Sequence, residues 1–315
     1  MEAPMNLVSI LIPVYNRKNM ILDTLSSARA QTYENIEIIV VDNASTDGTW
    51  EVISEIAGMD RRVKAFRNES NLGPVRNWLR CVEEATGTYA KILWSDDLIA
   101  PDYLESTLPF LDDSDVGFVF TATRVFDENP LIGELYHSIG ATGIYDSERF
   151  IEGDLRGEGY PVSPGCALFR LQDLRSSLLL HVPNSIGSDF SMHAIGNDLL
   201  LFLLVAHKYP KFAFVSRVLS FFRAHAGSIS ISSKNSKLPL HYNVARAYFV
   251  EHYRPDLISK LNGRLYLHLL RFPDSKDFGV SDVSNFYTIN KFYSFSRIWL
   301  LLFVGRKICK RYLGV

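Results

Sequence analysis

Ile92–Leu98 reads Ile-Leu-Trp-Ser-Asp-Asp-Leu, an apolar run that ends in two adjacent acids. Such a run predicts a buried strand that presents the carboxylates of Asp96 and Asp97 at its tip. Adjacent carboxylates repel each other, whereas Mg²⁺ and Mn²⁺ prefer oxygen ligands, and Mg²⁺ is often held by one or two carboxylates plus substrate phosphates. The pair therefore indicates a metal–diphosphate site. The alternative is an acidic turn in which Asp97 caps the helix that Pro101 helps to start.

The composition of the chain is that of an ordinary globular protein. Of its 315 residues, 47% are hydrophobic and 22% are charged. The formal net charge of -2 gives no basic excess, so we expect no nucleic-acid partner. The three cysteines are far apart and match no zinc or disulfide pattern, which fits a reducing compartment. No signal peptide pattern precedes the first strand, and the apolar runs are shorter than the ~20 residues that span a bilayer. We therefore expect a cytoplasmic protein.

Buried strands alternate with helices in the first hundred residues. Leu7–Val14 is almost continuously apolar, as expected for a strand that is covered on both faces of a parallel sheet. The alternation predicts right-handed βαβ units, and ligands in such sheets bind outside the carboxyl ends of the strands. Strands are expected at 7–14, 36–41, 63–67 and 89–94, and helices at 20–31, 50–57 and 75–86.

Polar side chains follow three of these strands at their carboxyl ends. Tyr15 and Arg17 follow the first strand, Asp42 follows the second, and Asp96 and Asp97 follow the fourth. Because these ends share one rim of the sheet, the residues should form one crevice. Such a crevice suits a nucleotide, with Tyr15 facing the base, Asp42 accepting from a base N–H, and metal-bound acids at the phosphates. Neither G-x-G-x-x-G after the first strand nor a P-loop is present, which argues against an NAD enzyme or an NTPase.

Four segments, in this order, resemble the motifs of the family-two glycosyltransferases. Ser9–Asn16 and Ile38–Thr49 look like the two opening motifs, and Asn71–Gly73 and Ser95–Asp97 look like the next two. The likeness is strong over roughly the first hundred residues and looser to about residue 230. It implies an α/β fold of the GT-A type, with a mostly parallel central sheet, helices on both faces and a C-terminal helical appendage. It also implies a Mg²⁺ or Mn²⁺ cofactor and inversion at the anomeric carbon of the sugar.

By this resemblance, the donor site falls on residues of these motifs. Asp42 would contact the uracil or thymine ring, Asp96 would face the ribose or the metal, and Asp97 would bind the metal. Asn71 is alternatively a turn former, and Arg76 is alternatively a solvated residue on a helix. The expected nucleotide-sugar-binding residues are Pro13, Tyr15, Arg17, Asp42, Asn71, Arg76 and Asp96.

An acid at the start of a strongly apolar helix is the expected general base. An inverting transfer needs a carboxylate that takes the proton of the acceptor hydroxyl. In the family, an acid at the start of such a helix, before an Arg-x-His segment, has this role. Asp198 fits, with Arg223 and His225 following; Asp189 is the alternative base, and an acid at a helix start is also favoured by the dipole alone. The same resemblance makes His225 a contact of the metal or the diphosphate.

The remaining segments carry the acceptor-site and domain predictions. Residues 127–159 are polar and lack clear periodicity, so we expect acceptor-binding loops there, and Gly165 would allow close backbone approach nearby. A boundary near residue 230 would separate a GT-A catalytic domain, 1–230, from a helical region, 231–315. The tail 292–313 mixes apolar and basic side chains. It either packs on the core or lies on an anionic membrane surface.

Together these features predict a metal-dependent inverting glycosyltransferase. It would move a sugar from a UDP- or dTDP-sugar to a hydroxyl of a glycan or lipid-linked acceptor, in bacterial surface polysaccharide synthesis, in the cytoplasm or on the inner face of the membrane. One alternative is a nucleotidyltransferase, which needs a basic phosphate loop where only Arg17 and Lys18 occur. The other is a non-catalytic sugar-nucleotide-binding or assembly protein. Its only support is Trp94, which stands where many family members carry a further acid, so that metal binding rests more heavily on Asp97.

Overall fold

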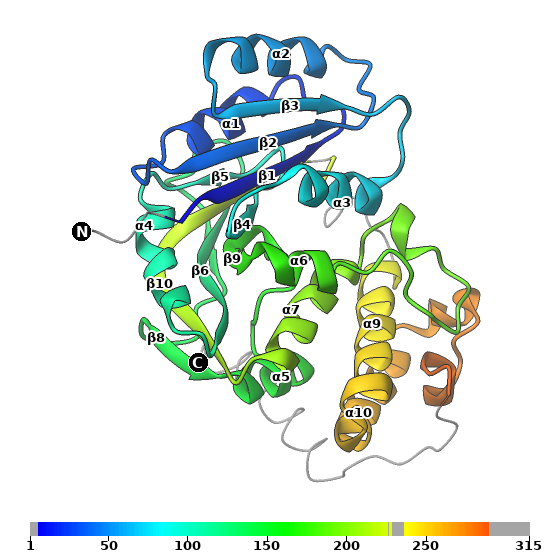
Figure 1. Ribbon diagram of the computed structural model, residues 1–315. Helices are drawn as coiled ribbons and strands as arrows, with labels where there is room; N and C mark the ends of the chain where they lie inside the picture. The colour runs from blue at the N-terminus through cyan, green and yellow to red at the C-terminus, as the bar shows by residue number, and fades with distance from the viewer. Residues whose placement is uncertain (1–5, 226, 229–235, 290–315) are drawn as a thin grey trace.

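The computed structural model describes residues 6–225, 227–228 and 236–289. These residues form one ten-stranded sheet with helices on both faces, which confirms the α/β class (Figure 1). The strand order is β3-β2-β1-β4-β9-β6-β10-β5, with β7 paired to β6 and β8 paired to β10. The strands are β1 (Val8–Val14), β2 (Ile36–Asp42), β3 (Val63–Arg67), β4 (Tyr89–Ile92), β5 (Leu98–Ile99), β6 (Val116–Phe126), β7 (Glu134–Tyr136), β8 (Gly143–Asp146), β9 (Ala167–Arg170) and β10 (Lys211–Arg223).

Helices connect and cover these strands. The α-helices are α1 (Ile21–Arg29), α2 (Thr49–Met59), α3 (Pro74–Glu84), α4 (Tyr103–Thr107), α5 (Ser147–Arg156), α6 (Leu171–Ser177), α7 (Asn197–Lys208), α9 (Lys237–Tyr253) and α10 (Ile258–Arg271). The 3-10 turns are η1 (Leu108–Asp112), η2 (Pro164–Cys166), η3 (Phe190–Met192), η4 (Pro255–Leu257), η5 (Pro273–Phe278) and η6 (Val283–Phe286).

The first four strands of the sheet, β3-β2-β1-β4, are parallel, as predicted. The last β1–β4 pair joins Leu11 to Ile92, and the next amide, that of Leu93, donates to the Leu11 carbonyl at 2.9 Å. Backbone groups two residues apart in a strand point to the same neighbour, so the nitrogen of Pro13 faces the side where β4 has ended. Proline therefore breaks no hydrogen bond of the ladder here. The two strands separate at this end, where the candidate site lies.

The other half of the sheet is mixed. β6 and β10 are parallel, whereas β9 runs antiparallel to both β4 and β6 and thereby joins the two halves. The short strands β5 and β8 add antiparallel pairs to β10. The predominantly parallel pairing is thus a property of the first half, where each crossover contains a helix.

Two apolar layers cover the sheet. In β1, Ile10 and Ile12 belong to the cluster that includes residues of α1, α2 and α4, whereas Leu11 belongs to the cluster that includes α3, α5, α6 and α7. This alternation follows from the period of two in a strand, with apolar residues needed on both faces.

Residues 127–159, expected to be loops, contain β7, β8 and α5. Helix α5 begins after Asp146, whose carboxylate accepts from the Glu148 amide at 2.7 Å. It ends at Gly157, which adopts a left-handed φ of 70°. The sequence analysis missed this helix, although its two cap residues and the apolar Phe150, which is buried, are visible in the sequence.

The region after residue 230, predicted to be helical, contains α9 and α10 among its described residues. Helix α9 packs on α7, and α10 packs on α9 and α5 (Figure 1). Their apolar residues join the same cluster as α7, so this helical region shares the core of the sheet's α3 side. The division at residue 230 remains a prediction. In the ranges that the structure describes, no helix is long and apolar enough to cross a membrane, and the tail 292–313 lies outside them.

Candidate active site

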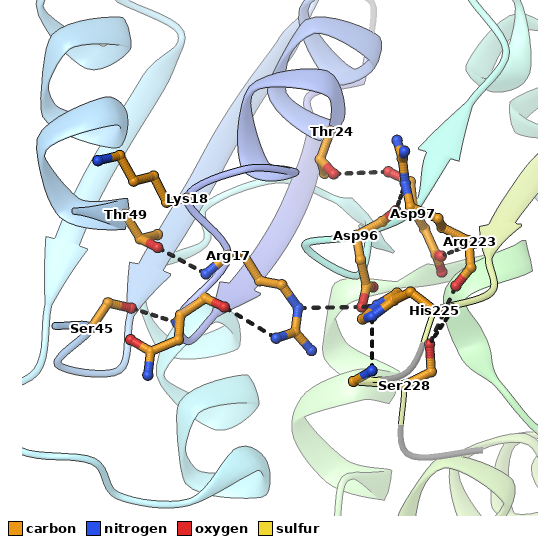
Figure 2. Close-up of polar contacts among 12 residues, drawn as sticks. Arg17, Lys18, Thr24, Ser45, Thr49, Asp96, Asp97, Arg223, His225 and Ser228 are labelled. Atoms are coloured by element: carbon orange, nitrogen blue, oxygen red, sulfur yellow. Dashed lines mark hydrogen bonds and ion pairs between the residues drawn. The ribbon is translucent and has the colours of Figure 1, made fainter. Parts of the chain in front are cut away.

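The loop after β1 is fastened to the turn after β2. Asn16 has a positive φ of 50°, and its amide donates to Ser45 Oγ at 2.8 Å. The Thr46 amide donates back to Asn16 Oδ1 at 2.9 Å, and the Arg17 amide donates to Thr49 Oγ1 at 2.8 Å. These bonds hold the backbone so that the Arg17 side chain reaches toward the acidic pair (Figure 2).

Two other predicted site residues, Arg17 and His225, contact Asp96, as Figure 2 shows. Asp96 Oδ2 lies 3.4 Å from Arg17 Nε and 2.9 Å from His225 Nε2. His225 Nδ1 accepts from the Gly227 amide at 3.1 Å, so Nε2 carries the ring proton and donates it to Asp96. The carboxylate is therefore flanked by a guanidinium and an imidazole that come from the ends of two other strands.

Asp97, the second acid of the pair, is buried and only 5% exposed. Its Oδ1 accepts from the Arg223 amide at 2.9 Å, and its carbonyl accepts from Thr24 Oγ1 at 3.0 Å. Burial, and then the neighbouring Asp96, raise the pKa of the Asp97 carboxyl well above its usual range. Because α4 begins only at Tyr103, Asp97 caps no helix, and that part of the alternative is wrong. The acidic pair does lie in a turn, in which the Asp97 amide donates to the Trp94 carbonyl at 3.0 Å.

The donor set at the acidic pair fits a shared metal site. Within the described ranges, no three His, Cys, Asp or Glu side chains are grouped so that they could hold a metal ion by themselves. Two carboxylates, however, are the protein's usual share when substrate phosphates complete the shell of Mg²⁺. A divalent cation would also favour the ionised form of Asp97, which burial and Asp96 disfavour. Asp96 and Asp97 therefore suit a metal held jointly with a diphosphate.

Asp42 is fully buried at the end of β2. Its Oδ2 lies 3.2 Å from Arg67 Nε and accepts from the Ser45 amide at 3.2 Å. Arg67 also donates to the Ser45 carbonyl at 2.8 Å. Sequence reasoning missed Arg67, although it is the register partner of Asp42 across the β2–β3 pair. The contact of Asp42 with a base remains a prediction.

Asn71 and Arg76 lie at the start of α3. Asn71 Oδ1 accepts from the Asn43 side chain at 2.8 Å and from the Gly73 amide at 2.9 Å, as a turn former does. Arg76 Nη1 donates to Ser191 Oγ at 2.7 Å, so its side chain bridges α3 and η3. The structure thus connects the predicted donor half to the segment that carries Asp189.

Pro13 and Tyr15 lie at the carboxyl end of β1. Pro13 is buried within β1, whereas the Tyr15 side chain beyond it is 42% exposed. The Tyr15 side chain is therefore accessible to solvent just beyond the carboxyl end of β1.

Trp94 stands where the family resemblance implied a further acid. Its Nε1 donates to Ser163 Oγ at 2.8 Å, and its ring centroid lies 4.6 Å from that of Trp78. A Cβ on Gly165 would lie only 2.8 Å from Trp94 Nε1, which is why glycine is needed there. The indole thus packs the η2 segment against the strand that carries the acidic pair.

Asp198 is the second residue of α7 and accepts three hydrogen bonds. The amides of Gly196 and Leu199 each donate to Oδ1 at 2.8 Å, and the Tyr242 hydroxyl donates to Oδ2 at 2.7 Å. Burial raises the pKa of the Asp198 carboxyl to about 6, although the hydrogen bonds oppose this shift. The helix start therefore carries a carboxylate that is ionised at neutral pH and more basic than an ordinary aspartate. Sequence reasoning missed Tyr242, which lies 44 residues further along the chain.

Asp189 has a different environment. It is exposed, and its Oδ1 accepts from the Ser191 amide at 3.0 Å and from Ser191 Oγ at 2.6 Å. These hydrogen bonds lower the pKa of its carboxyl. Asp189 borders a cavity of about 320 Å³ that is lined by residues 180–183 and 187–190.

The model of glycosyl transferase family 2 matches residues 9–177, more than half of the chain. The chain therefore belongs to this family, which confirms the resemblance carried by its sequence motifs. It spans between 30% and 46% of the length of the first four curated relatives that it matches. It is also 27% identical, over 79% of its own length and 90% of the relative's, to an Escherichia coli protein. That protein is the UDP-Glc:alpha-D-GlcNAc-diphosphoundecaprenol beta-1,3-glucosyltransferase WfaP.

Solved structures share the fold at low sequence identity. The S. aureus TarS 1–349 complex with UDP superposes with a TM-score of 0.63 at 17% identity, over 87% of this chain and 74% of TarS 1–349. The mannosyltransferase PcManGT of Pyrobaculum calidifontis, in complex with GDP-Man and Mn²⁺, superposes with a TM-score of 0.51 at 17% identity, over 97% of this chain and 80% of PcManGT. Both comparisons support the GT-A fold predicted from the sequence.

Proposed function

We propose that this chain is a metal-dependent inverting glycosyltransferase that uses a UDP- or dTDP-sugar. The acceptor would be a hydroxyl of a glycan or lipid-linked molecule in bacterial surface polysaccharide synthesis. The observation that carries the proposal is the contact of Asp96 with Arg17 and His225, which brings three strand ends together at one rim. Family membership and the printed activity of the WfaP relative support the reaction class and the lipid-linked acceptor.

The donor would bind along the rim formed by the first four strands. Tyr15 would face the base, and Asp42 would accept from a base N–H. Arg17 and His225 would donate to diphosphate oxygens, because charge-assisted hydrogen bonds to phosphate are strong. A Mg²⁺ or Mn²⁺ ion held by Asp97 and Asp96 would stabilise the charge that develops on the leaving diphosphate.

Asp198 would act as the general base. It takes the proton of the acceptor hydroxyl while that oxygen attacks the anomeric carbon, and the bond from this carbon to the diphosphate breaks on the opposite face. A carboxyl with a pKa of about 6 is ionised at pH 7 and accepts a proton more readily than an ordinary aspartate. The lowered pKa of Asp189 makes it the weaker base. This contrast favours Asp198.

The proposal includes the arrangement of the whole chain. Residues 1–230 would form the GT-A catalytic domain and 231–315 a helical region, with the tail 292–313 in peripheral contact with the membrane. A lipid-linked acceptor would be reached most readily by an enzyme held at that surface.

The test is a panel of UDP-, dTDP- and GDP-sugars, measured for binding and for slow hydrolysis with and without Mn²⁺. We expect one uridine or thymidine donor to bind only with metal and to be hydrolysed, and the Asp198→Asn variant to bind donor without transferring sugar. Donor binding without turnover over a range of acceptors would instead identify a non-catalytic binder. Release of pyrophosphate with nucleotide transfer would identify a nucleotidyltransferase.

A further inference from the structure

The carboxylate of Asp198 is held from a second, distant element of the chain. Helix α9 supplies Tyr242, whose hydroxyl donates to Asp198 Oδ2 at 2.7 Å. The other oxygen, Oδ1, accepts from two amides of its own helix start, those of Gly196 and Leu199. The two oxygens therefore have different roles: the local backbone fixes Oδ1, and α9 fixes Oδ2.

Close packing of α9 on the start of α7 makes this contact possible. Gly196 has a left-handed φ of 104°, and a Cβ there would lie 2.9 Å from the Ala245 Cβ and 2.8 Å from the Phe190 ring. Ala245 lies three residues after Tyr242, so both occupy the same face of α9. The absence of a side chain at Gly196 and the small one at Ala245 thus let α9 approach until Tyr242 reaches the carboxylate.

A buried ion pair fixes the rotation of α9 about its axis. Arg246, one turn after Tyr242, donates from Nε and Nη2 to the two oxygens of Asp154 on α5 at 2.7 and 2.6 Å. The Arg246 guanidinium also lies 5.9 Å from the Tyr242 ring centroid. Because a bidentate pair has a narrow geometry, it limits how far the Tyr242 hydroxyl can shift from Asp198.

We propose that Tyr242 is a positioning residue for the general base, so that the helical region after residue 230 directs the Asp198 carboxylate toward the acceptor hydroxyl. The inference rests on the proposed function, in which Asp198 is the base. Tyr242 acts through Asp198 and transfers no proton itself. It leaves the remaining lone pair of Oδ2 to accept the acceptor's proton.

The phenol also sets the basicity of Asp198. A hydrogen bond to the ionised carboxylate favours that form, so Tyr242 holds the Asp198 pKa below the value that burial alone would give. Besides Asp198 itself, the charged groups that act on Tyr242 are Arg246 and Asp154, which form an ion pair with each other. The neighbouring His241 has its pKa lowered by burial, so it is uncharged at neutral pH.

The decisive experiment is the pH profile of kcat/KM for the Tyr242→Phe variant of the full chain. In this profile kcat/KM falls at low pH as Asp198 becomes protonated, and this fall is its acid limb. Loss of a hydrogen bond to the charged carboxylate should move the midpoint of the acid limb up by about one pH unit. Activity should then fall about tenfold below wild type at pH 5 and much less at pH 8.5, with the donor KM unchanged. The matched control is Tyr248→Phe on the same helix, whose profile should superimpose on that of wild type.

The variants separate failure of this inference from failure of the proposed function. Full transfer by Asp198→Asn would overturn the base assignment itself. If Asp198→Asn is inactive but Tyr242→Phe keeps the wild-type profile, the role of Tyr242 is refuted and the base assignment stands. Should Tyr242→Phe not fold, a fluorotyrosine at position 242 provides the test. Its more acidic hydroxyl donates more strongly and should move the acid limb to lower pH, and an unmoved limb would refute the role.

Discussion

The pH dependence of transfer should distinguish the two candidate bases. Burial places the pKa of Asp198 at about 6, whereas the Ser191 hydrogen bonds place that of Asp189 below its ordinary value of 3.8. A base with a pKa of 6 is about 9% ionised at pH 5 and almost fully ionised at pH 8, from the titration of a single site. If Asp198 is the base, kcat/KM should therefore fall about tenfold between pH 8 and pH 5. If Asp189 were the base, kcat/KM would change little over this range.

The assay is initial-rate transfer with the acceptor varied, from pH 4.5 to 8.5, with circular dichroism at each pH to confirm folding. Asp97 also has a raised pKa, so metal loss could produce a similar acid limb. The two causes are separated by repeating the profile at two Mn²⁺ concentrations. The midpoint of an acid limb due to Asp97 shifts with the Mn²⁺ concentration, whereas the midpoint of one due to Asp198 does not. A profile that stays flat to pH 4.5, or an acid limb that shifts whenever the Mn²⁺ concentration changes, would show that Asp198 is not the base.

Two structural predictions concern the groups that hold the site together. Arg246→Ala leaves Asp154 as an unpaired buried charge and should cost about 3–5 kcal/mol of unfolding free energy. Arg156→Ala, which breaks pairs whose side chains are 22–28% exposed, should cost about 1 kcal/mol. Gly165→Ala should cost about 1–3 kcal/mol through overpacking against the adjacent indole, and activity should fall with it. Gly58→Ala, in the open part of α2, should instead stabilise by about 1 kcal/mol. Denaturant unfolding measures the stability of all four variants. Equal losses for Arg246→Ala and Arg156→Ala, or equal effects of Gly165→Ala and Gly58→Ala, would contradict the packing described.

The sequence predicts the first half of the sheet well, because its strands and the polar residues at their ends are recognised from local patterns. Leu7–Val14 is apolar because both faces are covered, and Pro13 is tolerated because β4 has already ended beside it. The rim residues Asp42, Asp96 and Asp97 follow directly from strand ends in a parallel sheet. The βαβ rule alone places the ends of these parallel strands at one edge of the sheet.

The parts that sequence reasoning missed depend on contacts between distant segments. Tyr242 reaches Asp198 only because α9 packs on α7, and no local pattern in residues 237–253 indicates this. Arg67 was within reach, since the register of β2 and β3 pairs it with Asp42. Helix α5 was overlooked because its apolar residues are few, although its caps at Asp146 and Gly157 could have revealed it.

Calorimetric titration of UDP into wild type and Asp97→Asn, with and without Mn²⁺, tests whether the acidic pair forms a metal-dependent donor site. Because ionised Asp97 is disfavoured in the folded chain, the amide should leave the metal-free protein at least as stable above pH 7. We expect wild type to bind UDP much more tightly with Mn²⁺, and Asp97→Asn to lose that gain while remaining folded. Equal UDP affinity in both proteins, with no response to Mn²⁺, would show that Asp97 holds no metal for the donor.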